Sequence, residues 1–307
     1  MSHPFKLVVP GDPTRLPGMK TLMADRMETG KVLYIPNVFY VERPEEKLHL
    51  QLLMPDGLFP TMKNGRLYPL VVYVQGAAWG EQEMFHNLPQ LARIAKEGFV
   101  VASVKHRASN VAPFPAFLQD VKSAIRFLRA NADMYSIDPD AVAIWGDSSG
   151  GNAALLVGVT GDLPEFKTAD NAEYSDAVKA VVDFYGPTDV SKINNAPRNP
   201  VFTADKSNIP EDVLFGGCVA ENPDICQPGN PINYVMAEKA LPPFLIMHGD
   251  SDAMVPFNQS ILMAQKLQAC GKTLEFYKVC GADHGFFLWT DEVLDTVVKF
   301  LKAYIGV

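Results

Sequence analysis

The sequence has little of what marks several protein classes. Its 307 residues include only four cysteines, without Cys-x-x-Cys spacing, which excludes a small disulfide-dense scaffold. Charged residues make up 20% and no tract is of low complexity, which excludes a largely disordered chain. No stretch approaches the ~20 apolar residues of a membrane span. The net charge of -8 argues against a nucleic-acid or anionic-membrane partner.

Targeting and cofactor signals are also missing. Residues 1–20 lack the basic start and long apolar run of a secretory signal, so we expect a cytoplasmic protein. We interpret the cysteines as reduced thiols, with a Cys218–Cys226 bridge as the alternative because it would close a short local loop. The sequence has no HExxH helix, P-loop or GxGxxG before a helix, so we expect no metal and no cofactor. It carries no signal for oligomeric state.

Apolar patterning predicts the fold class. Leu48, Leu50 and Leu52 alternate with polar residues, a period that favours a half-buried antiparallel strand. Strands buried on both faces are indicated by continuous apolar runs at 68–76, 98–107, 141–146, 180–186, 243–249 and, more weakly, 274–281. Helical periodicity occurs in 115–135, 256–271 and 291–305. This order predicts an α/β fold with a mostly parallel, doubly wound sheet and helices on both faces.

The pattern fits one domain, residues 1–307, with one irregular segment. Residues 188–239 are rich in Asn, Pro, Asp and Gly and show little periodicity. Loops of this length are usually functional or carry small elements of their own. We expect a cap-like insertion over the carboxyl edge of the sheet, or one wall of a pocket.

A candidate nucleophile lies in the stretch AVAIWGDSSGGNAALL, residues 141–156. Gly146 to Gly150 fit G-x-S-x-G at the place that pattern requires, after a buried strand and before a helix. Such a turn strains its central residue, and bulky neighbours at the two glycines would collide. We predict that Ser148 is the nucleophile and that the Ser149 amide is an oxyanion donor at the helix N-terminus. The alternative is a plain turn with polar filler.

A serine hydroxyl needs a base, and the base needs an acid that orients it. Asp252 follows one buried strand and His284 follows the next, at the edge where open α/β sheets gather their active sites. We interpret His248, the comparable histidine at a strand end, as packing. Asp250 is the alternative acid, but it can bond local backbone, and we favour Asp252.

These motifs together resemble the alpha/beta-hydrolase superfamily, and most of all its hormone-sensitive-lipase-like and bacterial acetyl xylan–feruloyl esterase-like carboxylesterases. The likeness rests on residues 114–154, on LPPFLIMHGDSDAMVPFNQS and on GADHGF, and extends over about 32–304. It implies an alpha/beta-hydrolase fold and a triad of Ser148, Asp252 and His284.

The expected oxyanion turn, VYVQGAAWG, follows the first buried strand, so its amides can face the same edge as Ser148. Where the family usually has His-Gly-Gly-Gly-Trp, this chain has Gln-Gly-Ala-Ala-Trp. The resemblance makes the amides of Ala77 and Ala78 the donors. If either alanine needs a positive φ, the turn is costly; if not, the two methyl groups narrow the pocket.

The resemblance implies a serine carboxylesterase for short-chain acyl esters, with acetylated or feruloylated sugars as the specific hypothesis. Its partner would be a small-molecule ester. Trp79 and Phe286 are the expected substrate-binding aromatics, although aromatics near a sheet edge are as often part of the core. Two alternatives remain: an amidase, aryl-formamidase or peptidase of the same fold, and a non-catalytic relative that binds a ligand in the pocket.

Overall fold

The computed structural model describes residues 12–22, 31–55, 65–195 and 209–306. Within them, one eight-stranded sheet has the order β1-β2-β4-β3-β5-β6-β7-β8. The strands are β1 (Leu33–Glu42), β2 (Lys47–Met54), β3 (Tyr68–Val74), β4 (Val100–Val104), β5 (Ile137–Asp147), β6 (Ala180–Phe184), β7 (Phe244–Gly249) and β8 (Leu274–Val279). The pairs β1–β2 and β2–β4 are antiparallel, and the other pairs are parallel. The predicted fold class is confirmed.

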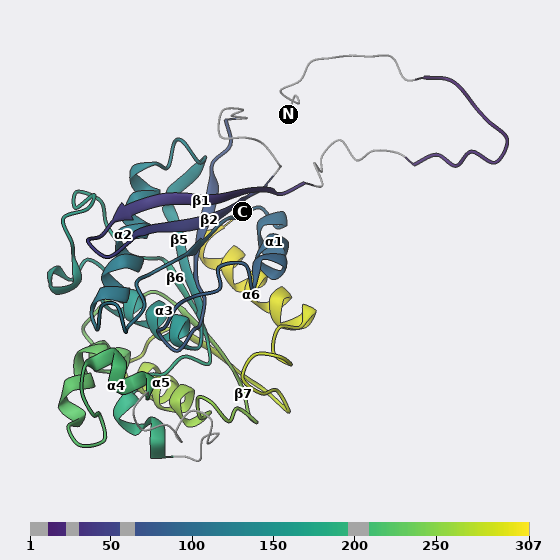
Figure 1. Cartoon of the computed structure of the whole chain (residues 1–307). Coiled ribbons are helices and arrows are strands. Elements are labelled where there is room, and N and C mark those ends of the chain that lie inside the picture. Colours follow the sequence, from purple (N-terminus) through teal and green to yellow (C-terminus); the bar gives the residue numbers. More distant parts are fainter. Residues whose placement is uncertain (1–11, 23–30, 56–64, 196–208, 307) are drawn as a thin grey trace.

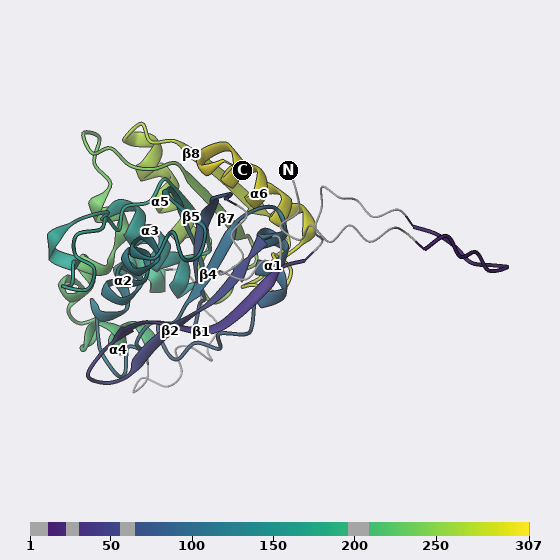
Figure 2. The same cartoon turned by 90° about the horizontal axis from the view of Figure 1, so that it is seen from above.

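Helices cover both faces of this sheet (Figures 1 and 2). On one face lie α1 (Leu88–Lys96) and α6 (Asp291–Ile305), and on the other α2 (Ala116–Ala130), α3 (Ser149–Val159) and α5 (Asn258–Ala269). The shorter helices are η2 (Pro164–Phe166), η3 (Val190–Asn195), α4 (Pro210–Phe215), η5 (Pro223–Gly229) and η6 (Pro231–Tyr234). Four of these, η3, α4, η5 and η6, belong to the predicted insertion between β6 and β7. None of the helices in the described ranges combines the length and apolarity needed to cross a membrane.

The central strands are buried on both faces, which explains their continuous apolar runs. In β3, Leu70, Val72 and Val74 belong to the core beneath α2 and α3, whereas Val71 and Tyr73 belong to the core beneath α1 and α6. Successive strand side chains point to opposite faces, so a strand between two helical layers needs apolar residues at nearly every position.

The strands at one side of the sheet differ from the expectation. In β2, Leu48, Leu50 and Leu52 are buried as predicted, but Gln51 between them is buried too. Tyr34 Oη of β1 donates to Gln51 Oε1 at 2.6 Å, and these neighbours cover the polar face. The pattern did not reveal β1, which supplies that cover. The four cysteines are free thiols, so the Cys218–Cys226 bridge is absent.

Candidate active site

Ser148 occupies a strained turn between β5 and α3. Its backbone has φ 54° and ψ -125°. Residues other than glycine rarely adopt a positive φ. A Cβ at Gly146 would meet the carbonyl of Gly150, and one at Gly150 would meet the carbonyl of Val74. The glycines therefore allow the turn to be tight enough to present the Ser148 hydroxyl at the carboxyl edge of the sheet.

The structure brings the three predicted triad side chains together. His284 Nε2 lies 2.9 Å from Ser148 Oγ, and His284 Nδ1 lies 2.7 Å from Asp252 Oδ2. The other Asp252 oxygen accepts the amides of Met254 and Val255 at 2.8 and 2.9 Å. The Nδ1 proton therefore points to the carboxylate, and Nε2 is left to accept the serine proton.

His248 supports the acid, a role that the sequence interpretation missed. Its Nε2 lies 3.2 Å from Asp252 Oδ2 and 3.0 Å from the Val255 carbonyl, which can only accept. The Nε2 proton therefore faces the acid, and the Ser260 hydroxyl donates to Nδ1 at 2.7 Å. The four-residue separation of His248 and Asp252 across the end of β7 was the available signal.

The two histidines keep Asp252 charged. Burial raises the pKa of this carboxyl, but hydrogen bonds from His248 and His284 outweigh burial and hold the pKa well below its ordinary value. Asp250, the alternative acid, instead accepts the Gly281 amide at 2.7 Å and ties the end of β7 to the end of β8.

The sequence left open whether an alanine of the turn after β3 adopts a positive φ, and the structure shows that one does. Ala78 and Trp79 have φ of 50° and 58°, and the Gly80 amide donates to the Ala77 carbonyl at 2.8 Å. Each non-glycine residue in this left-handed region costs about 1–2 kcal/mol. The Trp79 ring is buried and donates through Nε1 to Asn152 Oδ1 at 3.2 Å, which anchors the turn.

The expectation for Ala77 is corrected. Its amide donates to Ser149 Oγ at 2.9 Å, so this donor is already bound to a side chain of α3. Ala78 and Ser149 line the cavity at Ser148, and Ala77 does not. The physical reason is the second serine of the elbow, whose hydroxyl lies within reach of the amide.

A small cavity of about 30 Å³ opens beside Ser148. It is lined by Ala78, Trp79, Ser148, Ser149, Pro187, Ile193, Pro210, Glu211, Met254, Val255 and His284. Ile193, Pro210 and Glu211 come from the 188–239 segment and form part of its wall. Most of the other lining side chains are apolar.

Of the two aromatics expected to bind substrate, Trp79 lines this cavity and Phe286 does not. Phe286 is 89% exposed, whereas Leu288 in the same loop is fully buried in the core beneath α6. Leu288 anchors the loop, and Phe286 projects into solvent. Phe286 thus lies outside the cavity beside Ser148, and a role for it in substrate binding stays a prediction.

A second acid, Asp183, lies buried at the end of β6. Its Oδ1 accepts the Gly186 amide at 2.9 Å, while Oδ2 has no hydrogen-bond partner among the described residues. Burial in this place raises the pKa of Asp183 to about 7. The folded protein thus binds a proton here that the unfolded chain, with a pKa of about 3.9, releases at much lower pH.

Stability should fall with rising pH because of Asp183. A raised carboxyl pKa stabilises the fold below pH ~4 relative to pH 7, and this contribution is lost as the pH rises from ~4 to ~7. The change amounts to roughly 4 kcal/mol at most. We expect Asp183→Asn to flatten the free energy of unfolding between pH 5 and 8, measured in urea. Asp140→Asn at an exposed position should not flatten it, and an unchanged slope in Asp183→Asn would contradict the assignment.

No group of three His, Cys, Asp or Glu side chains in the described ranges is arranged to hold a metal ion.

Comparison with known proteins identifies the family. The sequence pattern of the BD-FAE family matches residues 56–267, more than half of the chain. The chain belongs to the BD-FAE family. The resemblance inferred from the three motifs is thereby confirmed.

Two curated relatives of this BD-FAE protein are esterases of Mycobacterium tuberculosis. It is 29% identical to esterase LipQ over 81% of the chain and 57% of LipQ. It is 30% identical to esterase LipC over 72% of the chain and 53% of LipC. The chain thus spans about half the length of these relatives.

Solved structures share the fold. A truncated carbohydrate esterase from gut microbiota is 29% identical with a TM-score of 0.78, over 89% of this chain and 96% of that one. A bifunctional GH43-CE protein of Bacteroides eggerthii is 32% identical with a TM-score of 0.76, over 88% of this chain and 38% of that one. An esterase from Thermogutta terrifontis, 23% identical with a TM-score of 0.70 over 87% of this chain and 94% of that one, shows the fold alone.

Proposed function

We propose that the protein is a serine carboxylesterase that hydrolyses short-chain acyl esters through an acyl-enzyme on Ser148. The observation that carries this proposal is the unbroken hydrogen-bonded chain Ser148–His284–Asp252, of which Ser148 and His284 line a cavity. Membership of the BD-FAE family and the esterase names of LipQ and LipC support it.

The geometry suggests how the reaction would run. Ser148 Oγ attacks the ester carbonyl while His284 Nε2 takes its proton, and Asp252 stabilises the imidazolium that forms. The amides of Ala78 and Ser149 donate hydrogen bonds to the carbonyl oxygen as negative charge develops on it. His284 then returns the proton to the leaving alkoxide, and water repeats the sequence on the acyl-enzyme.

The cavity supports a short acyl group. It is small, and Trp79, Ile193 and Val255 present apolar surface around the serine. We expect turnover of p-nitrophenyl esters to decrease from acetate to butyrate to octanoate. A serine-directed fluorophosphonate should form one adduct, at Ser148, identified by peptide mass spectrometry.

Other results would favour the alternatives. Faster turnover of anilides or formanilides than of the matched esters would favour the amidase or formamidase. An absence of both turnover and adduct would favour a ligand-binding relative.

A second part of the proposal concerns which alcohol the ester substrate carries. Glu211, the second residue of α4, is only 2% exposed and lines the cavity among apolar side chains. A carboxylate in such a wall is suited to accept hydrogen bonds from hydroxyl groups of a substrate. The two carbohydrate esterase structures that resemble this chain support a sugar as the alcohol. We therefore propose acetylated sugars as the substrate class.

Glu211→Gln tests this assignment because it removes the charge and keeps the shape. We expect kcat/KM for an acetylated xylooligosaccharide to fall about 10- to 100-fold, the value of a hydrogen bond to a charged group. Turnover of p-nitrophenyl acetate should stay within about threefold, because that ester has no hydroxyl to bind. Glu221→Gln, at an exposed position of the same segment, is the control. Equal losses on both substrates, or no loss, would contradict a role in sugar binding.

A further inference from the structure

The hydroxyl of Ser149 occupies an unusual position in this site. Ser149 is the first residue of α3 and is 3% exposed, yet it lines the same cavity as Ser148. Its Oγ does not cap its own helix. Instead it accepts the Ala77 amide from the turn after β3 at 2.9 Å. The bond joins the two segments that flank the reacting carbonyl in the proposed mechanism.

The direction of this hydrogen bond leaves the hydroxyl proton available. An amide can only donate, so Ser149 Oγ is the acceptor and its own proton is free to point elsewhere. Among the hydrogen bonds of the described residues, none uses that proton as the donor. A hydroxyl that accepts one hydrogen bond donates a stronger one, because the two bonds polarise each other.

We propose that the Ser149 hydroxyl is a third oxyanion donor. It accepts a hydrogen bond from the Ala77 amide and donates its own proton to the oxygen on which negative charge develops. It would act beside the amides of Ala78 and Ser149. This inference rests on the proposed esterase function. It assigns a catalytic role to a side chain that sequence reasoning valued only for its amide.

The surrounding contacts hold this donor in place before substrate binds. The Gly80 amide bonds the Ala77 carbonyl at 2.8 Å, and the Ser109 amide bonds the Trp79 carbonyl at 2.8 Å. The turn that carries Ala77 is therefore fixed on both sides, and the N-terminus of α3 adds positive potential at the same point. A donor fixed in advance stabilises a transition state without a cost of reorganisation.

Two variants at this position test the assignment. Ser149→Ala removes the hydroxyl, and Ser149→Thr keeps it with one added methyl group. We expect Ser149→Ala to lower kcat for p-nitrophenyl acetate about 100-fold with KM within threefold, as for the loss of one oxyanion donor. Ser149→Thr should retain kcat within about fivefold of the wild type. A trifluoromethyl ketone, which forms a tetrahedral adduct, should inhibit Ser149→Ala about 100-fold more weakly.

The outcomes separate this inference from the proposed function. If the wild type turns over the ester and Ser149→Ala keeps kcat within threefold, the inference alone is overturned. A fall in Ser149→Thr as large as that in Ser149→Ala would also overturn it, because shape rather than the hydroxyl would then matter. Absence of turnover in the wild type would overturn both.

Discussion

Ser148→Ala is expected to lower kcat for p-nitrophenyl acetate by about a millionfold, to a residual rate supported only by binding and the oxyanion donors. The variant removes the atom that would form the acyl-enzyme, and His284 Nε2, 2.9 Å from Ser148 Oγ, loses the proton that it would accept. The measurement is initial rate under saturating substrate, with single-turnover assays for the slow variant.

The losses of kcat from changes at Ser148 and His284 should not add, because the two residues act in the same step. His284→Ala should cost nearly as much as Ser148→Ala, and the double variant should be no slower than either, because each change alone disables the same step. Ser251→Ala is the matched control, since this exposed serine lies at the same edge of the sheet and should stay within twofold. A Ser148→Ala variant with more than 1% of wild-type kcat would contradict the nucleophile assignment.

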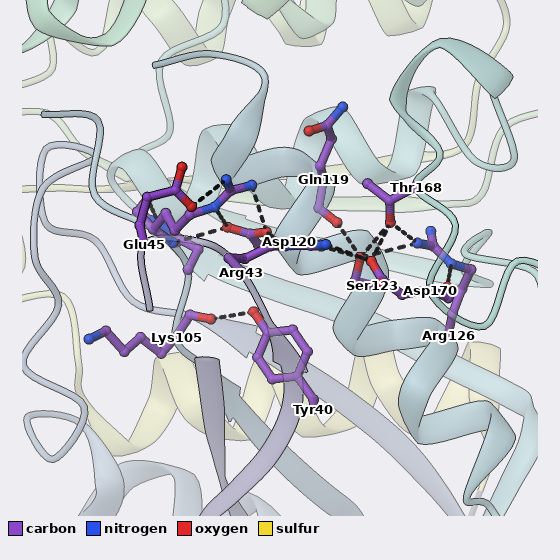
Figure 3. Close-up of polar contacts among 12 residues, drawn as sticks. Tyr40, Arg43, Glu45, Lys105, Gln119, Asp120, Ser123, Arg126, Thr168 and Asp170 are labelled. Atoms are coloured by element: carbon purple, nitrogen blue, oxygen red, sulfur yellow. Dashed lines mark hydrogen bonds and ion pairs between the residues drawn. The ribbon is translucent and has the colours of Figure 1, made fainter. Parts of the chain in front are cut away.

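The largest effect on stability is expected from Asp120→Asn. Asp120 of α2 is fully buried and accepts hydrogen bonds from two arginines: Arg43 Nε at 2.9 Å, and Arg107 Nε at 2.8 Å and Nη2 at 3.0 Å. Figure 3 shows Arg43, between β1 and β2, reaching Asp120 on α2. Removing the central charge would leave two poorly hydrated guanidinium groups without their main counter-charge.

Breaking a buried ion pair in this way costs about 3–5 kcal/mol. For a chain of this length that corresponds to a decrease in Tm of roughly 5–8 °C, measurable by calorimetry. Glu97→Gln is the matched control: Lys302 Nζ lies 2.8 Å from Glu97 Oε2, but both side chains are 42% exposed. Exposed pairs contribute about 0–1 kcal/mol. Equal shifts in the two variants would show that burial does not set the effect.

The positions of glycine and of apolar residues in the sequence predicted most of the fold. Five continuous apolar runs correspond to the largely buried strands β3 to β7, because a strand covered by helices on both faces has no polar side. The weaker run at 274–281 corresponds to β8, an edge strand in which no residue is buried. The alternating run at Leu48 to Leu52 was placed correctly as an antiparallel strand, but its partner β1 was not predicted. Only one of the ten residues of β1, Tyr40, is buried, and five are exposed, so its pattern carries little signal.

The sequence by itself determined the local chemistry: which serine follows a strand, which acid and histidine follow the later strands, and which glycines the elbow requires. These are short-range properties, because steric limits on a turn act within a few residues. The tertiary structure alone decided where side chains from distant segments point. It bound the Ala77 amide to Ser149, turned Phe286 to solvent, set His248 behind Asp252 and brought Glu211 to the cavity. Hydrogen-bond partners are chosen by distance in space, which sequence spacing does not encode.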